Sequence, residues 1–300
     1  MKLKAFIPYK LYKPLSITGS WCSLNCRFCS RKYLENMVFT NPENFSNVVH
    51  DLYYNGVRGI LVSGGFRPDA TLPIEPYIDS ICIVKKKLDI VISAHLGLVE
   101  DRNVLASLKN CIDVVDYEFT LSSFIINEVR GLKFGKERYI KALNLMLEEG
   151  LHVIPHVFVW HPRIKTDELS GELRTLLEMG VHEAALLVFI DNEYRGYREK
   201  IAEIVLRNIE LARSVFPGKL YMGCMRPGWL KPLLDPLIIE RNLVDRVVNP
   251  HHTLLRERSN IVMYDACCSV PEHLLNRFQL TYTLTTKQTI EYALNTQFTR

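Results

Sequence analysis

The sequence predicts an α/β fold, a TIM-type (β/α)8 barrel followed by a C-terminal extension. Short β-branched or apolar runs alternate with longer amphipathic segments between residues 15 and 258. Runs that are apolar on both faces suit a parallel sheet covered by helices, and eight strand–helix units in about 250 residues match the usual size of a complete barrel. No Gly/Ser/Pro-rich linker divides the chain, so we favour a barrel over the alternative, an open doubly wound sheet.

The expected elements follow one another in order along the chain. The strand runs occupy residues 15–19, 58–63, 89–94, 112–119, 152–159, 183–190, 219–223 and 246–248. Apolar residues at three- and four-residue spacing predict helices over 44–54, 139–149, 166–179 and 199–215. Because the final segment breaks this alternation, we place the barrel at residues 1–258 and the extension at 259–300.

The composition is that of a globular protein. Hydrophobic residues make up 48% of the chain and charged residues 23%. No apolar run approaches the roughly 18 residues that a bilayer crossing needs, and the N-terminus lacks the apolar core of a signal peptide. The net charge of +4 comes from scattered basic residues, which gives little support to nucleic-acid binding. We therefore expect a cytoplasmic protein without membrane contact, in which clustered cysteines are metal ligands more readily than disulfides.

Three cysteines follow the first expected strand in the spacing C-x3-C-x2-C, at Cys22, Cys26 and Cys29. Composition alone would produce this spacing only about 0.006 times per chain. Three thiolates on one loop can bind three irons of a [4Fe–4S] cube and leave the fourth iron open, and an open coordination position is typical of a catalytic metal. Phe28 would shield one side of that cluster. A structural zinc site is the alternative, but it would need a fourth ligand and usually a second C-x2-C pair, which the sequence lacks.

The cysteine loop resembles the hallmark of the radical S-adenosylmethionine (SAM) superfamily. The resemblance implies that SAM binds the open iron, and that an electron from the cluster cleaves SAM to methionine and a 5′-deoxyadenosyl radical that abstracts a substrate hydrogen. A second superfamily mark, Ser63-Gly64-Gly65, follows the second strand, and the resemblance assigns it to the methionyl end of SAM. Phe66 stands where the family often has an acid.

A second group of cysteines occurs late in the chain. Cys224 follows the seventh strand, and the pair Cys267-Cys268 lies in the predicted extension. We expect the extension to cover the barrel mouth, so that these three thiols hold an auxiliary [4Fe–4S] cluster beside the first one. Adjacent side chains point differently along a strand, so one member of the pair need not be a ligand. Cys82 and Cys111 fit the simpler interpretation of small buried side chains.

Further motifs resemble the radical SAM proteins of archaea and thermophiles once labelled biotin-synthase-like, which include the paired subunits of the two-component lipoyl synthase. These motifs are SGG at 63–65, AHLGLV at 94–99, IPH at 154–156, GCMRP at 223–227 and the late CC pair. The resemblance implies sulfur insertion into an unactivated carbon, with the auxiliary cluster as sulfur donor. The segments 157–161 and 120–124 depart from the family pattern, so the substrate can differ from that of the lipoyl enzymes.

Several other residues follow strands and are candidates for the site. Glu118 could hydrogen-bond the SAM ribose, or form a surface salt bridge. His156 lies inside an apolar strand, where a core histidine is the default, but the family resemblance makes it a candidate for the cofactor pocket. His95 and Arg226 could bind a carboxylate or a cluster, and Arg226 is the stronger catalytic candidate because it neighbours Cys224.

The leading hypothesis is therefore a radical SAM enzyme of the lipoyl/biotin synthase type, containing two clusters. It would need a reducing electron donor such as ferredoxin, and its resemblance suggests a sister radical SAM subunit and a lipoyl-carrier-type protein substrate. One alternative keeps SAM cleavage but uses the auxiliary cluster for electron transfer or substrate binding. Another is a noncatalytic cluster-binding subunit of a two-protein synthase, and a zinc-stabilised binding module is the most remote.

Overall fold

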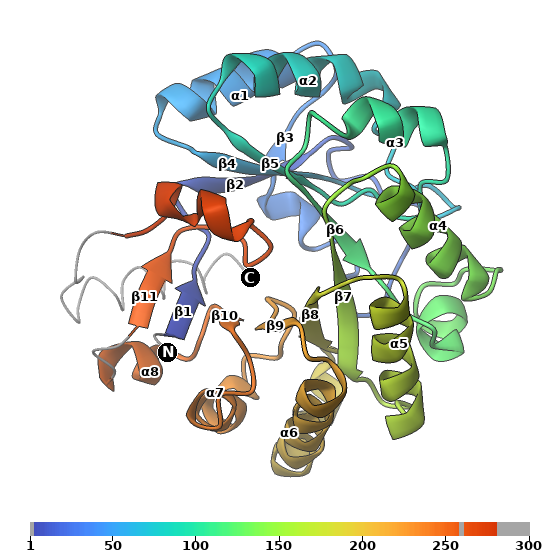
Figure 1. The fold of residues 1–300 in the computed structure, drawn as a ribbon, viewed down its shortest axis with the longest axis vertical. Coiled ribbons are helices and arrows are strands. Elements are labelled where there is room, and N and C mark those ends of the chain that lie inside the picture. The colour runs from blue at the N-terminus through green and yellow to red at the C-terminus, as the bar shows by residue number, and fades with distance from the viewer. Residues whose placement is uncertain (1–2, 258–260, 281–300) are drawn as a thin grey trace.

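The computed structural model describes residues 3–257 and 261–280 and contains one curled parallel sheet with helices around it (Figure 1). The strands are β1 (Leu3–Phe6), β2 (Tyr12–Ser16), β3 (Val38–Phe39), β4 (Gly59–Ser63), β5 (Val91–Ala94), β6 (Val114–Glu118), β7 (Val153–Trp160), β8 (Glu183–Val188), β9 (Lys219–Met222), β10 (Arg246–Val248) and β11 (Ile261–Tyr264). The α-helices are α1 (Phe45–Tyr54), α2 (Ile78–Lys87), α3 (Arg102–Leu108), α4 (Glu137–Glu148), α5 (Thr166–Glu178), α6 (Arg198–Val215), α7 (Lys231–Glu240) and α8 (His252–Glu257). Short helical turns are η1 (Leu34–Asn36), η2 (Glu75–Tyr77), η3 (Phe124–Val129), η4 (Asn192–Tyr197) and η5 (Glu272–Arg277).

The strand order confirms the barrel-type fold that the sequence predicts. Each expected strand run overlaps one observed strand, β2 or one of β4 to β10. The sheet runs in the order β11-β1-β10-β9-β8-β7-β6-β5-β4-β2-β3, and every pairing of adjacent strands is parallel. From β4 to β10 consecutive strands are neighbours and the order never reverses. A doubly wound sheet has such a reversal, so that alternative is excluded.

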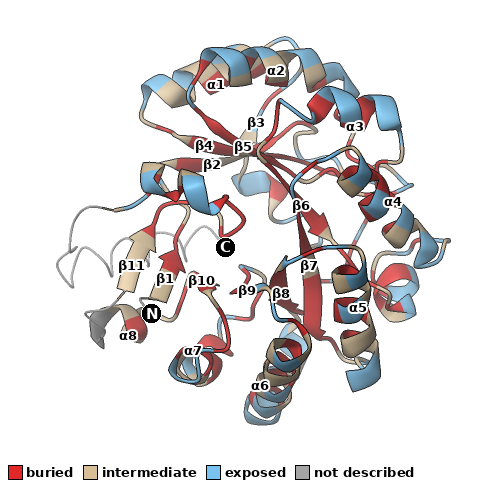
Figure 2. Cartoon of the chain, viewed as in Figure 1, coloured by how far each residue is buried: buried red, intermediate tan, exposed pale blue. Residues whose placement is uncertain are grey.

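The packing follows from the alternation of side chains along each strand. Residues on the outer face of the sheet join the main hydrophobic core under the helices, as Val115 and Tyr117 of β6 do. The Tyr117 hydroxyl donates a hydrogen bond of 2.8 Å to the Tyr139 carbonyl of α4. Helix α5 presents Leu169, Leu173 and other apolar side chains to the sheet at helical spacing. Figure 2 accordingly shows a buried sheet within helices whose outer sides are exposed.

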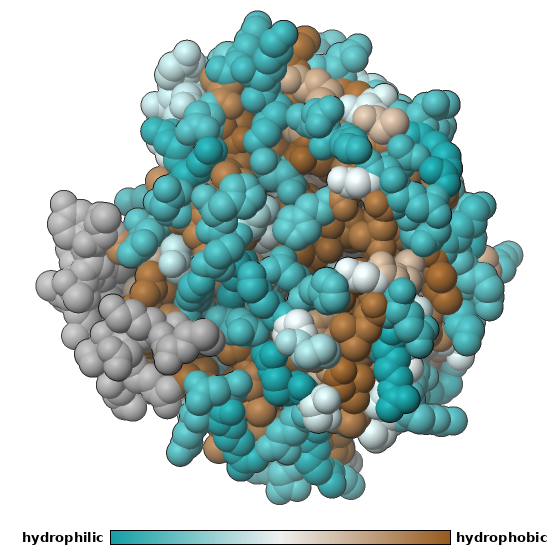
Figure 3. Space-filling model, viewed as in Figure 1, coloured by the Kyte–Doolittle hydropathy of each residue, from teal (hydrophilic) through white to brown (hydrophobic). Residues whose placement is uncertain are grey.

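The inner face of the sheet surrounds a space that we call the lumen, and the carboxyl ends of the strands form what we call the mouth. A second hydrophobic cluster fills the part of the lumen near the amino ends of the strands. Its members include the first residues of β2, β5 and β6, which are Tyr12, Val91 and Val114. On the outer surface, Figure 3 shows hydrophilic residues over much of the helical ring and hydrophobic residues gathered between the helices.

The described part of the C-terminal extension packs at the amino ends of the strands. Phe278 is fully buried, and its ring meets Tyr12 edge-on at 6.0 Å between ring centroids. Arg277 forms an ion pair of 2.8 Å with Asp89, which lies just before β5. We expected this extension at the mouth, but its apolar residues complete the lumen cluster at the opposite end, while residues 258–260 and 281–300 lie outside the described structure. The barrel also extends past the expected boundary at residue 258, because β11 pairs with β1.

Two further expectations concern the cysteines and the membrane. Cys82 of α2 and Cys111, which follows α3, form a disulfide with a Cα–Cα distance of 4.7 Å. Their interpretation as unpaired core residues was wrong, because the chain folds α2 and α3 side by side and brings the two thiols together. None of the helices in residues 3–257 and 261–280 combines the length and the apolarity that a bilayer crossing requires.

Candidate active site

The first cysteine loop follows β2 and lies at the mouth. Cys26 is buried, whereas Cys22 and Cys29 are half-buried. The loop turns back on itself because the amides of Cys29 and Ser30 both donate to the Cys26 carbonyl, at 3.0 and 2.8 Å. Burial raises the pKa of Cys26 to about 12, so its free thiol is neutral at ordinary pH. A bound metal ion is what would hold such a sulfur as thiolate.

The Gly-Gly turn after β4 packs directly against this loop. A Cβ atom on Gly65 would lie 1.8 Å from the Trp21 carbonyl oxygen and 2.5 Å from Cys22 Cα. Only glycine therefore permits this approach of two backbones. Thr18 joins the two segments, because its hydroxyl accepts a hydrogen bond from the Gly65 amide at 2.6 Å and donates to the Trp21 carbonyl at 3.0 Å. The amide of Phe66 also donates to Cys22 Sγ at 3.3 Å.

Aromatic rings form one wall beside the cysteine loop. Phe28 lies with its ring centroid 5.8 Å from that of Phe158 in β7 and 5.9 Å from that of Phe189, which follows β8. All three side chains are buried. Phe158 and Phe189 therefore pack with Phe28, which was expected to shield the cluster. The three rings together exclude water from this side of the cysteine loop.

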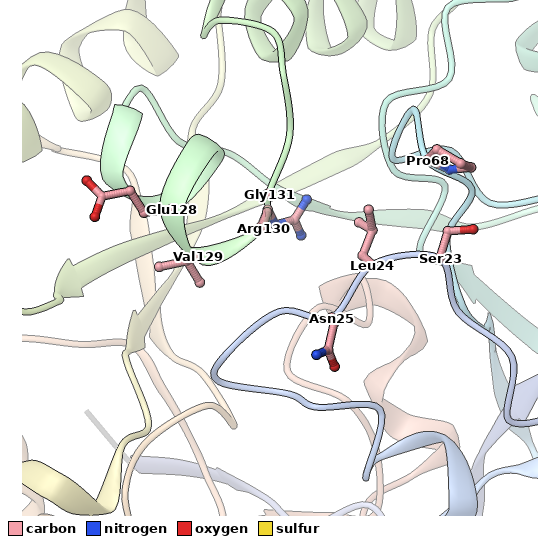
Figure 4. Close-up of a pocket in the computed structure, with 8 residues that line it drawn as sticks. All are labelled: Ser23, Leu24, Asn25, Pro68, Glu128, Val129, Arg130 and Gly131. Carbon is pink, nitrogen blue, oxygen red and sulfur yellow. The ribbon is translucent and has the colours of Figure 1, made fainter.

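Glu118, at the end of β6, lies in an ion pair close to the cysteine loop. Its Oε2 is 2.7 Å from a guanidinium nitrogen of Arg130, while its Oε1 is buried without a hydrogen-bond partner. A pocket of about 350 Å³ adjoins this pair. Figure 4 shows Ser23, Leu24 and Asn25 of the cysteine loop on one side of the pocket and the turn 128–131 on the other.

The upper part of the lumen is polar. Ser63 ends β4 and His95 follows β5, whereas Asp116 and His156 lie within the neighbouring strands β6 and β7. The hydroxyl of Ser63 lies 3.1 Å from Nδ1 of His95, and the rings of His95 and His156 are 6.4 Å apart between centroids. His156 Nδ1 lies 3.1 Å from the carbonyl oxygen of Ile154. The expected candidates His95 and His156 are therefore neighbours, with Asp116 between them.

The sequence profile of the Radical SAM superfamily matches residues 16–174, which is more than half of the chain. The chain belongs to the radical SAM superfamily. The matched part includes β2 with its cysteine loop and β4 with its Gly-Gly turn, the two segments that pack against each other at the mouth. No curated protein is similar enough in sequence to count as a match.

Solved structures share the fold. The crystal structure of SuiB from Streptococcus suis superposes with a TM-score of 0.56 at 14% identity, over 86% of this chain and 58% of SuiB. SuiB bound to the precursor peptide SuiA gives a TM-score of 0.51 at 15% identity, over 82% of this chain and 50% of that one. Methylornithine synthase (PylB) gives 0.52 at 15% identity, over 80% of this chain and 72% of that one. The chain thus spans about half the length of SuiB, and at these identities the likeness concerns the fold alone.

Radical SAM enzymes use a [4Fe–4S] cluster and SAM, and the residues of the first loop fit that pair. Cys22, Cys26 and Cys29 supply three sulfurs, and the Phe66 amide is placed as an N–H···S donor of the kind that stabilises cluster thiolates. Because Gly65 has no side chain, the Gly-Gly turn can lie directly against the cysteine loop. In the described part of the chain no three His, Cys, Asp or Glu side chains stand in an arrangement that holds a metal ion, so cluster binding requires the thiols to draw together.

The second cysteine group comes from two distant parts of the chain. Cys268 is buried in the lumen, Cys267 is half-buried and Cys224 is exposed. The pKa of Cys268 is raised well above its usual value by a hydrogen bond with Cys267 and by burial, and further by the nearby Cys224 and Asp116. Arg246 donates to the Cys268 carbonyl and so holds this segment on β10.

Arg226 does not take the catalytic place that the sequence suggested. Its side chain is fully buried, with Nε 3.0 Å from Asp235 Oδ1 in α7. It also donates to the carbonyls of Gly223 and Val248, at 3.0 and 3.1 Å. These partners occupy the guanidinium group, so Arg226 is a positioning residue that joins the loop after β9 to β10 and α7.

Sequence reasoning missed three residues of this site, namely Thr18, Asp116 and Arg130. Asp116 left a usable signal, because an acid in the middle of the apolar run 112–119 is unusual in a buried strand. Thr18 and Arg130 left none, since Gly65 and Glu118, the partners that reveal their roles, are brought to them only by folding.

Proposed function

We propose that this protein reductively cleaves SAM to a 5′-deoxyadenosyl radical and uses that radical to insert sulfur into an unactivated carbon, as lipoyl and biotin synthases do. The cleavage chemistry is supplied by the cluster and SAM when they are bound at Cys22, Cys26 and Cys29. An auxiliary cluster at Cys224, Cys267 and Cys268 would supply the sulfur. The close packing of the Gly65 turn on the Cys22 backbone is the observation that carries the first part of the proposal.

The sulfur-insertion part draws its support from the second group of cysteines. Cys267 and Cys268 face the lumen region that contains Asp116, and Cys224 is near enough to raise the pKa of Cys268. A sulfur source inside the barrel would lie within reach of a carbon radical formed there, which is the advantage that proximity gives to such a reaction.

Residues of this chain would prepare the site in three ways. Phe28 and its aromatic partners exclude water from the cluster. Glu118 keeps one buried oxygen without a partner, which suits the expected hydrogen bond to a SAM ribose hydroxyl. His95 and His156 lie deeper in the lumen and would contact the substrate, or in the case of His156 the cofactor.

The partners follow from the chemistry. An electron donor such as ferredoxin would reduce the cluster in the cytoplasm, and Trp21, which is 50% exposed beside Cys22, lies on the surface that such a donor would approach. A sister radical SAM subunit and a lipoyl-carrier-type protein remain the partners suggested by the family resemblance.

Anaerobic reconstitution followed by iron analysis tests the cluster assignments. We expect about eight irons per chain in the wild type and about four in Cys26→Ala or in the double variant Cys267→Ser/Cys268→Ser, because each of these proteins loses one cube. Cys82→Ser is the matched control and should keep eight. Zinc without iron in the wild type would contradict the proposal.

Turnover with SAM and a reductant tests the chemistry. The wild type should release 5′-deoxyadenosine, and Cys26→Ala should not. Loss of sulfide from the auxiliary cluster into an octanoyl carrier would support sulfur insertion. An auxiliary cluster that stays intact through turnover would instead favour a role in electron transfer or substrate binding.

A further inference from the structure

Asp116 is the buried acid in the lumen that the proposed chemistry leaves without a role. It lies on the inner face of β6, between Val115 and Tyr117, which both point to the helices. Its side chain is only 1% exposed, yet neither carboxylate oxygen has a hydrogen-bond partner. An ionised carboxylate in such a place costs several kcal/mol unless donors or a cation surround it.

The surrounding side chains do not supply those donors. Nε2 of His95 lies 3.9 Å from Asp116 Oδ2, and Nε2 of His156 lies 3.9 Å from Oδ1. Both distances exceed the reach of a hydrogen bond. The hydroxyl of Tyr12, also in this part of the lumen, is already bonded to Ser93.

The two histidines are open to a ligand, whereas the carboxylate between them is covered, so a ligand reaches Asp116 only as the rings turn aside. The side chain of His95 is 38% exposed and that of His156 is 14% exposed, although both residues lie inside the ring of strands. Their rings stand nearly perpendicular, at 87°, on either side of the carboxylate. Ser63 contacts His95 and also begins the turn that packs on the cysteine loop, so a ligand held on Asp116 would lie beneath the expected radical source.

We propose that Asp116 binds a positively charged nitrogen of the substrate, a primary ammonium group, with His95 and His156 on its two sides. An ammonium group carries the charge and the N–H donors that the two carboxylate oxygens lack, and charge-assisted hydrogen bonds of this kind are strong in a buried site. The substrate is therefore an amine-bearing molecule and not an octanoyl lysine, whose nitrogen is a neutral amide, and a carboxylate or phosphate group is excluded from this position by repulsion. The inference rests on the proposed function only in taking the lumen as the substrate site.

Binding of small probes to the protein without cofactors tests this directly. We would measure the affinity of hexylammonium, hexanol and hexanoate for the wild type and for Asp116→Asn by calorimetry. Hexylammonium should bind the wild type, and at least about tenfold more weakly to Asp116→Asn, because a buried charge pair is lost. Hexanol and hexanoate should bind poorly to both. Equal binding of all three probes, or unchanged hexylammonium binding in the variant, would overturn the proposal.

The stability of the ligand-free protein gives a second test. Asp116→Asn should leave the thermal midpoint unchanged or raise it, because the variant removes an unpartnered buried charge. Asp265→Asn is the matched control, since Asp265 is equally buried but accepts from the backbone amides of Tyr9, Lys10 and Leu11. The control should lower the midpoint. A comparable loss in Asp116→Asn would make Asp116 a structural residue and refute the ammonium site.

These outcomes are separate from those for the proposed function. If the wild type releases no 5′-deoxyadenosine but binds hexylammonium through Asp116, the ammonium site stands and the radical chemistry fails. If SAM is cleaved but hexylammonium binding is absent or independent of Asp116, the radical chemistry stands and the ammonium site fails.

Discussion

At the scale of single residues, contacts of the backbone hold the cysteine loop as much as its side chains do. Gly65 touches the backbone of Trp21 and Cys22, Thr18 bridges the two segments, and the Phe66 amide reaches the Cys22 sulfur. The Gly-Gly turn was expected to contact SAM, and its observed neighbour is the loop that would carry the cluster. The contact of this turn with SAM stays a prediction.

Replacing Gly65 with alanine should disrupt cluster binding. The added Cβ would overlap the backbone of the cysteine loop, so the turn and the loop must separate. We expect iron content after reconstitution to fall severalfold while the circular dichroism of the barrel is retained. Gly228→Ala is the control, because nothing lies within 4 Å of a Cβ at that position. Full iron content in Gly65→Ala would show that the contact is not required.

Glu172 of α5 should make the stability of the protein depend on pH. Burial raises its pKa to about 8, and its Oε1 accepts hydrogen bonds from the Leu121 amide and the Thr120 hydroxyl, at 2.6 and 2.9 Å. The folded chain keeps a proton that the unfolded chain releases above about pH 4.5. The free energy of unfolding should therefore fall as pH rises from about 4.5 to 8, by a few kcal/mol at most.

Glu172→Gln should remove this pH dependence, because glutamine keeps the acceptor oxygen and carries no charge. Denaturant unfolding at pH 5 and pH 8 measures the effect. Glu178→Gln, at an exposed position of the same helix, should behave as the wild type. A wild-type stability that is equal or greater at pH 8 would contradict the assignment of a raised pKa.

At the scale of elements, the outer helices contribute a covalent link that the cysteine pattern did not reveal. Cys82 and Cys111 are 29 residues apart in sequence, and between them the chain passes through the end of α2, through β5 and through α3. A disulfide that closes a loop of this length stabilises a fold by about 3.6 kcal/mol in the chain-entropy estimate. It lies on the helical ring, away from the cysteines assigned to clusters.

Thiol counting tests this link. The denatured, unreduced, iron-free chain should show six reactive thiols, since the chain contains eight cysteines and two are paired. Cys82→Ser should then show seven reactive thiols, because Cys111 is released, and should unfold at lower denaturant. Eight reactive thiols in the wild type would show that the bond does not form.

At the scale of the whole molecule, the first strand and the segment 261–280 complete the barrel from one side. Strand β1 pairs with β10 and β11, and the segment after β11 fills the lumen near the amino ends of the strands. Glu272 forms ion pairs with Lys4 and Arg246, at the beginning of two strands. The lumen is thereby closed by apolar side chains at one end and left polar at the mouth.

Removing Phe278 should weaken the entire fold. Its ring is fully buried and lies against Tyr12 and the backbone of Gly59, so Phe278→Ala leaves a cavity at the start of β2 and β4. We expect a loss of about 3–5 kcal/mol in the free energy of unfolding. Phe39→Ala is the control, because that ring is 49% exposed and should change stability little. A loss of less than about 1 kcal/mol in Phe278→Ala would show that the segment does not close the barrel.

The chain order of most strands was predictable, whereas β1, β3 and β11 were not expected. Runs such as 58–63 and 183–190 are long and apolar on both faces, which marks them as interior strands whatever surrounds them. Strands β1, β3 and β11 have two to four residues, and they form strands only because they hydrogen-bond to neighbouring strands of the sheet. The described part of the extension lies elsewhere than expected, because apolar residues at 266–278 indicate burial without indicating at which end of the barrel.

The sequence by itself determined the superfamily and the first cysteine loop, because Cys22, Cys26 and Cys29 lie within eight residues and a short loop holds them together in any fold. The tertiary structure decided which distant residues meet. It buried Arg226 against Asp235, paired Cys82 with Cys111, and set Asp116 between two histidines from neighbouring strands. Contacts between parallel strands join residues tens of positions apart, and no local pattern specifies them.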